Sequence, residues 1–159
     1  MFGFFKKKFN IVAPVDGKVI ELSKVPDEVF AQKLAGDGVG IDSISDIITA
    51  PADGKLTLIF NTNHAFAMTL DNGVEILVHI GIDTVELKGE GFERLVETGS
   101  RVNSGEPIIK INRQLIKKRG YSLVTLVLIA NMDVIDKIDY NLDTQVKSGK
   151  NIVFNYKIK

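Results

Sequence analysis

The chain has 159 residues, of which 45% are hydrophobic and 25% are charged, proportions that are ordinary for a globular domain. Twenty basic residues balance twenty acidic ones, and no basic stripe with interleaved aromatic residues appears, which argues against a nucleic-acid-binding protein. The absence of cysteine excludes disulfide bonds, thiolate chemistry and cysteine-ligated zinc, and it is consistent with a reducing cytoplasm.

The chain starts with an apolar and then basic segment, residues 1–9, which contains four phenylalanines and three consecutive lysines. A secretory signal has the reverse order, and no run in the chain is long enough to span a bilayer. Two interpretations stay open for residues 1–10: a frayed tail, or a weak and reversible contact of segment 1–9 with the membrane surface. We therefore expect a cytoplasmic protein, free or peripheral at the inner face of the membrane, with one domain over residues 11–159.

Two sequence units each occur twice. Ala13–Ile20 recurs as Ala50–Thr57, each with a leading Ala-Pro, an Asp-Gly turn and a lysine that opens an apolar strand. Val102–Ile109 recurs as Val146–Val153, each with a Ser-Gly turn before a β-branched strand. The spacing is irregular and only two copies exist, so the pattern indicates duplication within one core and not a solenoid.

Short runs of apolar and β-branched residues occupy most of the remaining chain, separated by Gly, Asn, Asp and Ser. This pattern predicts an all-β sandwich or barrel with a few short helical turns. The run Leu123–Ala130 is apolar on both faces, which predicts a central strand. The other predicted strands are Leu56–Phe60, Ala65–Leu70, Val74–Ile80 and Ile108–Ile111, and the predicted helical turns are Asp27–Leu34, Phe92–Glu97, Arg113–Lys118 and Asp133–Ile138.

The only two histidines of the sequence, His64 and His79, flank a predicted hairpin. Asn72-Gly73 between them is a strong signal for a two-residue type I′ turn, which would set His64 opposite Gly81. Since residues two apart on a strand share a face, His79 would lie on the face of His64, about 5–8 Å away between β-carbons. A loop one residue longer would put the two histidines on opposite faces.

The same alternation predicts what surrounds the two imidazoles, namely Thr62, Phe60, Phe66 and Leu77. A lone histidine in an apolar strand is more often a packed core residue with a satisfied hydrogen bond. A second imidazole on the same face and the small Gly81 beside His79 weigh against that interpretation. Because imidazole is unprotonated near neutral pH, the pair suits nucleophilic chemistry.

Three kinds of chemistry could use this pair. A hydrolase with a histidine base needs a serine nucleophile, and the chain has no Gly-x-Ser-x-Gly segment. Zinc enzymes normally use three protein ligands, so His64 and His79 would hold zinc only if a partner supplied a further ligand. Phosphoryl transfer to nitrogen needs no metal and no cofactor, because one imidazole takes the group while the other binds its oxygens. A zinc-dependent hydrolase and a purely regulatory binding module stay open as alternatives.

Around the second histidine the chain resembles a known family. Gly73–Val85 is similar to the phosphorylation-site signature of glucose-type enzyme IIA, a component of the bacterial sugar phosphotransferase system. Further matching motifs follow one another within residues 11–155, and they are the first Ala-Pro-x-Asp-Gly copy, Gly36–Gly38, Asn63–Phe66 and Leu87–Phe92. The resemblance implies an antiparallel β-sandwich built on a duplicated, hybrid motif. It also implies a phosphotransferase with a phosphohistidine intermediate and a single enzyme IIA domain over residues 11–159.

The resemblance implies roles for single residues as well. His79 would accept the phosphoryl group on Nε2, His64 would stabilise that group during transfer, and Thr62 would fix the tautomer of His64. The implied donor is the phosphocarrier protein HPr, and the implied acceptor is the IIB domain of a permease for glucose or a related sugar. The implied partner-binding surface combines the acidic Asp37 and Asp83 with the apolar Val39, Phe60, Phe66 and Leu77.

Overall fold

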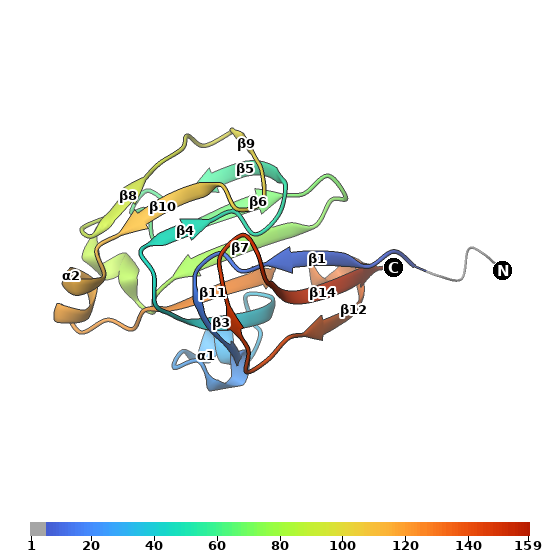
Figure 1. The fold of residues 1–159 in the computed structure, drawn as a ribbon, viewed down its shortest axis with the longest axis horizontal. Coiled ribbons are helices and arrows are strands. Elements are labelled where there is room, and N and C mark those ends of the chain that lie inside the picture. Colours follow the sequence, from blue (N-terminus) through green and yellow to red (C-terminus); the bar gives the residue numbers. More distant parts are fainter. Residues whose placement is uncertain (1–5) are drawn as a thin grey trace.

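In the computed structural model, which describes residues 6–159, antiparallel sheets pack around a shared hydrophobic core (Figure 1). The largest sheet has eight strands in the order β13-β2-β3-β11-β7-β6-β5-β9, and two three-stranded sheets have the orders β1-β14-β12 and β4-β10-β8. The strands are β1 (Phe9–Val12), β2 (Gly17–Glu21), β3 (Asp37–Ser43), β4 (Ile47–Thr49), β5 (Gly54–Ile59), β6 (Ala65–Thr69), β7 (Glu75–Ile80), β8 (Phe92–Arg94), β9 (Arg101–Val102), β10 (Pro107–Ile111), β11 (Val124–Ile129), β12 (Ile135–Tyr140), β13 (Gln145–Val146) and β14 (Ile152–Ile158). The predicted all-β sandwich is therefore confirmed.

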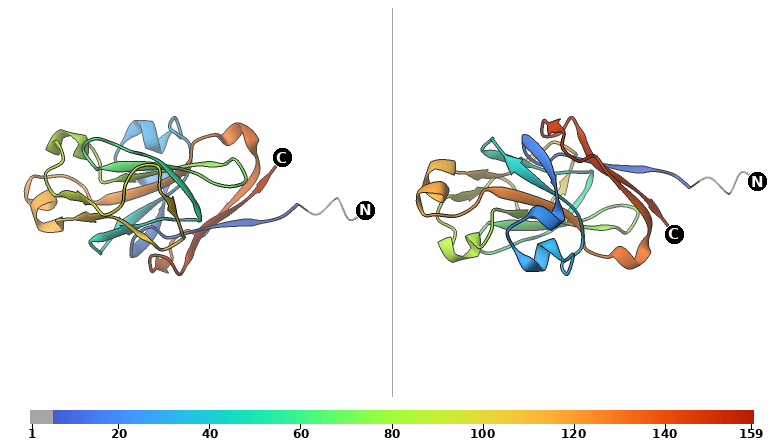
Figure 2. Two further views of the ribbon diagram at one scale, coloured as in Figure 1. Left: turned by 90° about the horizontal axis from the view of Figure 1, so that it is seen from above. Right: turned by 90° about the horizontal axis from the view of Figure 1, so that it is seen from below.

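Helical structure is limited to short segments. They are α1 (Glu28–Ala31), α2 (Arg113–Lys118) and the 3-10 turns η2 (Leu22–Lys24), η3 (Thr84–Leu87) and η4 (Met132–Val134). In both views of Figure 2, α2 lies at one end of the molecule and the C-terminal end of β14 lies at the other. None of these helices has the length and hydropathy that crossing a bilayer requires.

The two copies of each repeated unit take equivalent places in the eight-stranded sheet. β13 pairs with β2 at one edge, and β9 pairs with β5 at the other. The two Ser-Gly turns contain Gly105 and Gly149, whose backbones approach each other closely. Gly105 N–H donates to the carbonyl of Ala50 (2.8 Å), and Gly149 N–H donates to the carbonyl of Ala13 (2.9 Å), so the hydrogen bonds are duplicated together with the sequence.

β11 is the central strand that its sequence predicts. It lies between β3 and β7, and its residues from Leu126 to Ile129 are fully buried. Val127 packs into the main core between the sheets, whereas Leu126 and Leu128 face the opposite side and belong to a second apolar cluster. A strand covered on both faces reads as a continuous apolar run, as this one does.

The second apolar cluster lies under α1 and η2, which cover the outer face of β3 and β11 (Figure 1). Leu22, Val25 and Phe30 pack there against Leu126 and Leu128. Four residues cannot form a stable helix alone, so α1 depends on this packing and on its N-terminal cap. The cap is Asp27, whose side chain accepts hydrogen bonds from the backbone N–H groups of Val29 and Phe30. Together α1 and η2 form a lid over β3 and β11 and leave the outer face of β5, β6 and β7 uncovered. The two histidines lie beside the edge of this lid.

Two of the four predicted helical turns are wrong. Phe92–Glu97 contains strand β8, because Phe92 is buried and pairs with Ile111 of β10. In Asp133–Ile138 only the start is helical, since strand β12 begins at Ile135 and pairs with β14. The predictions for α1 and α2 are confirmed, the latter with its bounds. Amphipathic runs this short fit either structure, and strand pairing decides between them.

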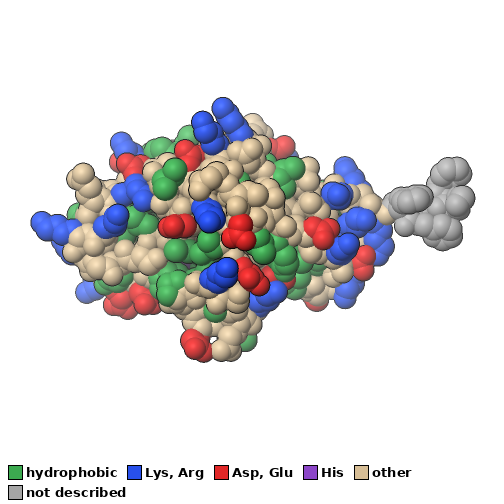
Figure 3. Space-filling view, turned by 60° about the horizontal axis from the view of Figure 1, so that its bottom comes forward, with side chains coloured by type: hydrophobic (Ala, Val, Ile, Leu, Met, Phe, Trp, Pro, Cys, Tyr) green, Lys and Arg blue, Asp and Glu red, His purple; other side chains and the backbone are tan. Residues whose placement is uncertain are grey.

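The tail predicted for residues 1–10 is shorter than expected. Phe9 and Asn10 belong to β1, and the Phe9 ring stacks on Tyr156 of β14 with 5.4 Å between centroids. Phe9 is therefore part of the fold, partly buried against the main core. Residues 1–5, which carry the other phenylalanines of that prediction, lie outside the described residues. In Figure 3, side chains of both charge signs are interspersed around hydrophobic ones, in keeping with the balanced composition.

Candidate functional site

His79 lies on the outer face of β7, at the edge of the lid formed by α1. In the sheet register it stands opposite Leu126 of β11 and Ala65 of β6, and its ring contacts Phe30 with 4.9 Å between centroids. Nδ1 is 2.8 Å from the carbonyl oxygen of Gly81. Because a carbonyl oxygen can only accept, Nδ1 carries the proton, and Nε2 keeps its lone pair.

His64 lies in the turn before β6, with its ring centroid 5.1 Å from that of His79 and the two ring planes 81° apart. Its Nδ1 is 2.5 Å from the hydroxyl of Thr62, and Phe60 packs edge-on against it at 5.4 Å. Thr62 thereby occupies one ring nitrogen and leaves Nε2 of His64 for another partner. The structure therefore brings together the two imidazoles, the hydroxyl and one of the predicted aromatic residues.

The two histidines meet for a different reason than the one predicted. The hairpin has a three-residue loop, because Leu70 pairs with Val74 and only Gly73 in the loop has a positive φ. This register sets Ala65 directly across from His79, and it places His64 beside Ile80 instead of opposite Gly81. The in-and-out alternation of strand side chains does not apply to His64, because this residue precedes β6. It follows Asn63, which has a left-handed φ of 59°. The backbone bend at Asn63 therefore turns His64 toward His79.

Both imidazoles are neutral at pH 7. Burial, together with the nearby His79, lowers the pKa of His64 to about 4. Burial also lowers the pKa of His79, while the hydrogen bond to Gly81 and the charges of Asp27 and Asp83 act in the opposite direction. A neutral His79 is a nucleophile, and a neutral His64 is a hydrogen-bond donor through one nitrogen only.

The lowered pKa of His64 makes stability depend on pH. The unfolded chain protonates this histidine below about pH 6.5, and the folded chain only near pH 4, so the unfolded state holds more protons in between. Folding stability must therefore fall as the pH falls through this window. We expect His64 to account for a loss of about 1–2 kcal/mol between pH 7 and pH 5. Urea unfolding at both pH values measures it, and the loss should shrink by that amount in His64→Gln; an equal loss in both proteins contradicts the assignment.

Two carboxylates act on His79, and one of them differs from the prediction. Asp83, at the start of η3, is exposed and has a φ of 59°. Asp27, the cap of α1, is the other carboxylate, and it is not among the site residues predicted from the sequence. Asp37 was selected instead but is buried, with its oxygens 2.5 Å from the Tyr140 hydroxyl and 3.5 Å from Lys33 Nζ. The signal that could have identified Asp27 is its position after Pro26 and before an apolar helical segment, which is typical of an N-cap.

Two residues predicted for the partner-binding surface lie in the main core. Val39 and Phe66 are fully buried and pack there with Val78 and Val127. Phe66 is opposite Val78 in the register, so the longer hairpin loop places it on the inner face, away from His79. Both predictions are therefore wrong, whereas Phe60 and Leu77 are half-buried on the outer side, as expected.

Gly81 positions the carbonyl that holds His79. Its φ is +76°, and a β-carbon there would lie 2.5 Å from the Thr84 methyl and 2.7 Å from the Ser122 carbonyl. We expect Gly81→Ala to lower the free energy of unfolding by about 2–3 kcal/mol, since backbone strain and crowding add. Gly99→Ala is the matched control, because its φ of +93° is similar but its surroundings are open. It should lose about 1 kcal/mol. Equal losses in urea unfolding would contradict the crowding.

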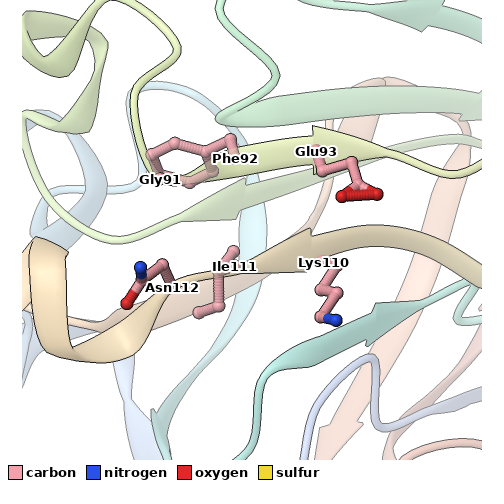
Figure 4. A pocket seen from close by; sticks show the side chains of 6 residues that line it. All are labelled: Gly91, Phe92, Glu93, Lys110, Ile111 and Asn112. Atoms are coloured by element: carbon pink, nitrogen blue, oxygen red, sulfur yellow. The ribbon is translucent and has the colours of Figure 1, made fainter.

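Apart from the histidine pair, a hollow of about 270 Å³ lies between β8 and β10 (Figure 4). The residues that line it are Gly91, Phe92, Glu93, Lys110, Ile111 and Asn112. None of them is a histidine, so the hollow lies apart from the two imidazoles. Within residues 6–159, no three His, Cys, Asp or Glu side chains are grouped so that they could hold a metal ion. The histidine pair is therefore the candidate site for chemistry at an imidazole nitrogen.

Comparison with known proteins gives a consistent result. The chain matches the family model for the phosphoenolpyruvate-dependent sugar phosphotransferase system, EIIA 1, over residues 9–135. It is 46% identical over 140 residues to the glucose-specific EIIA component of Borreliella burgdorferi, covering 87% of this chain and 74% of that protein. It is 42% identical over 160 residues to the glucose-specific EIIA component of Buchnera aphidicola, covering 96% and 95%.

Longer relatives and a solved structure match as well. The chain is 39% identical over 148 residues to the N-acetylglucosamine-specific EIICBA component of Escherichia coli, covering 93% of this chain but only 23% of that protein. The solved structure of glucose permease IIA from Mycoplasma capricolum superposes with a TM-score of 0.88 at 36% identity, covering 96% of this chain and 97% of the other.

Proposed function

The chain belongs to the EIIA family of the phosphoenolpyruvate-dependent sugar phosphotransferase system, and from this premise we propose that His79 is its phosphorylated residue. Phosphoryl transfer in sugar uptake is the function of the family. In our proposal the phosphoryl group comes from phosphorylated HPr and goes to the IIB domain of a sugar permease. Relatives named for glucose and for N-acetylglucosamine make these two sugars the first candidates for the permease.

The hydrogen bond between His79 Nδ1 and Gly81 is the observation that carries the proposal. It leaves the Nε2 lone pair free to attack the phosphorus atom of the donor. A new bond forms between Nε2 and phosphorus, the phosphorus–nitrogen bond to the donor imidazole breaks, and the donor nitrogen keeps the electron pair. Transfer to the acceptor follows the same steps, with Nε2 of His79 as the leaving group. No metal is required, because positioning and charge stabilisation are sufficient.

We propose that His64 stabilises the phosphoryl group while it is transferred. With Thr62 bound to Nδ1, His64 can present an Nε2–H to a phosphoryl oxygen of the group on His79. Such a donor helps because negative charge accumulates on those oxygens. In this proposal Thr62 has a supporting role, because its hydroxyl donates to Nδ1 and so keeps the ring proton of His64 on Nε2.

The surroundings of the histidine pair support docking of a partner protein. Beside Phe60 and Leu77, the uncovered outer face of β5 to β7 forms an apolar hollow of about 330 Å³. Leu58, Ala67 and Leu77 are neighbours across the three strands, and Leu58 is exposed. An apolar centre with a polar rim is typical of protein interfaces, and it would exclude water from a labile phosphohistidine. Asp27 and Asp83 are the carboxylates at the rim that we expect to meet arginines of the partners.

Reconstitution tests the proposal directly. The protein is incubated with phosphoenolpyruvate, enzyme I and HPr, and its intact mass is measured before and after brief acid treatment. We expect one phosphoryl group per chain, removed by acid because a phosphorus–nitrogen bond is acid-labile, and delivered to a IIB domain when one is added. No incorporation in the presence of active HPr would overturn the proposal.

A further inference from the structure

The turn that carries His64 is a tight, hydrogen-bonded segment between β5 and β6. Phe60 N–H donates to the Ala65 carbonyl (2.9 Å), and Asn63 N–H donates to the Phe60 carbonyl (2.7 Å). Asn63 has a φ of 59°, a left-handed conformation that asparagine tolerates better than most residues. His64 is not inside a strand, so the geometry of this turn decides where its ring lies.

The guanidinium of Arg94 binds this turn from another sheet. Arg94 is the last residue of β8, which belongs to the sheet β4-β10-β8, whereas β5 and β6 belong to the eight-stranded sheet. Its Nε donates to the side-chain oxygen of Asn63 (2.8 Å), and its Nη2 donates to the backbone carbonyl of Phe60 (3.4 Å). The planar guanidinium thus binds both Phe60, at the start of the turn, and Asn63, at its left-handed bend.

Arg94 differs from the other arginines in what it binds. Arg101, Arg113 and Arg119 each form an ion pair with a carboxylate, whereas Arg94 forms none within the described residues 6–159. It is half-buried, so its hydrogen bonds compete less with water than those of an exposed arginine. Among the described residues, the side chain of Arg94 donates hydrogen bonds to Asn63 and Phe60 of the turn and forms no ion pair.

We infer that Arg94 is a positioning residue for phosphoryl transfer, acting through Asn63 on His64. The inference rests on the proposed function of the histidine pair but adds a residue that lies outside it. Without the guanidinium, the Asn63 bend loses its anchor to β8, and the His64 ring loses its fixed distance to His79. Because displacement of a catalytic group by about 1 Å costs up to about a hundredfold in rate, the effect should fall on transfer and not on partner affinity.

Transfer kinetics provide the first test. In Arg94→Gln we expect the rate of transfer to the IIB domain at saturating acceptor to fall about 10- to 100-fold. The KM for the acceptor should change less than about twofold, because Arg94 does not line the docking surface. Arg101→Gln is the matched control, because Arg101 also joins two segments, but it binds Asp71 in the loop between β6 and β7. This variant should transfer the phosphoryl group at the wild-type rate. A wild-type rate in Arg94→Gln, or a change in KM alone, would overturn the inference.

A spectroscopic test is independent of activity. Nitrogen NMR of histidine-labelled protein reports the tautomer and the pKa of His64, which burial keeps at about 4. In Arg94→Gln the pKa of His64 should rise toward its ordinary value, and in Arg101→Gln it should not change. An unchanged His64 titration in Arg94→Gln contradicts positioning, even if transfer fails for other reasons. If the wild-type protein accepts no phosphoryl group, the proposed function fails, while this titration still decides the role of Arg94.

Asn63→Gly completes the test. Glycine accepts the left-handed φ but removes the side-chain oxygen that Arg94 binds. If both residues act through this one hydrogen bond, the double variant with Arg94→Gln should transfer about as slowly as the slower single variant. Rate losses that multiply would show that the two residues act separately and would overturn the inference.

Discussion

Replacement of His79 by alanine is expected to abolish phosphorylation of the protein. In His79 the backbone carbonyl of Gly81 holds the proton on Nδ1, so Nε2 has a free lone pair. In His64 the hydroxyl of Thr62 occupies Nδ1 instead. Removal of His79 leaves His64 as the only imidazole, and in the proposed tautomer its Nε2 carries a proton and has no free lone pair, so the rate should fall by at least about a thousandfold. Intact-mass measurement after incubation with phosphoenolpyruvate, enzyme I and HPr provides the readout.

Two controls accompany this variant. His79 is half-buried beside Phe30, so circular dichroism and urea unfolding must first show that His79→Ala is folded. His64→Ala, which removes the other imidazole, should still become phosphorylated. Full labelling of folded His79→Ala would mean that another residue is the acceptor, and the assignment of the site would be abandoned.

The His64→Gln variant is expected to accept the phosphoryl group but to pass it on about a hundredfold more slowly. Glutamine retains an N–H donor of similar reach, but its amide cannot hold the orientation that Thr62 gives the imidazole. Loss of one preorganised donor to a developing charge typically costs about a hundred- to a thousandfold in rate. Because His79 keeps its own bond to Gly81, its nucleophilic nitrogen is unaffected.

Single-turnover measurements separate the two half-reactions of this variant. Phosphorylation by HPr is followed first, and the isolated phosphoprotein is then mixed with the IIB domain. Thr62→Val is the companion variant, since it keeps the volume and removes only the hydroxyl that orients His64; it should show a smaller loss in the same step. Unimpaired transfer by His64→Gln would remove His64 from the mechanism.

The hairpin illustrates what the sequence cannot specify. Asn-Gly fits both a two-residue turn and a three-residue loop that ends in a left-handed glycine, and the structure has the latter. Asn72 donates to the Tyr156 hydroxyl (2.9 Å) and accepts from Val74 N–H (3.1 Å), contacts that favour the longer loop. Tyr156 is 84 residues away in sequence, so local pattern could not reveal that choice.

The acidic rim illustrates a second limit. Asp37 and Asp27 are both carboxylates close to α1, and only their tertiary partners distinguish them. Asp37 forms an ion pair with Lys33 and accepts a hydrogen bond from the hydroxyl of Tyr140, which is 103 residues away in sequence. Burial and the hydrogen bond to Asp37 raise the pKa of Tyr140, so its hydroxyl remains a donor to this carboxylate. Asp27, in contrast, caps α1 and reaches His79 with its charge.

Strands were predicted best where the apolar pattern was longest. β11 needed no tertiary information, because its continuous apolar run fits a strand covered on both faces. In β7, buried residues alternate with partly exposed ones, which is typical of a strand covered on one face. The duplicated units predicted an internal duplication, and the structure adds that their copies lie at the two opposite edges of the large sheet. The histidine pair could be selected because the chain contains no other histidine, although its geometry depends on the bend at Asn63.

Phosphorus–nitrogen correlation NMR of the phosphorylated, histidine-labelled protein tests the central claim most directly. If Gly81 fixes the tautomer of His79 as its hydrogen bond indicates, the phosphorus must couple to Nε2 of His79, and Nδ1 must retain its proton. Coupling to Nδ1 of His79, or to either nitrogen of His64, would contradict the account.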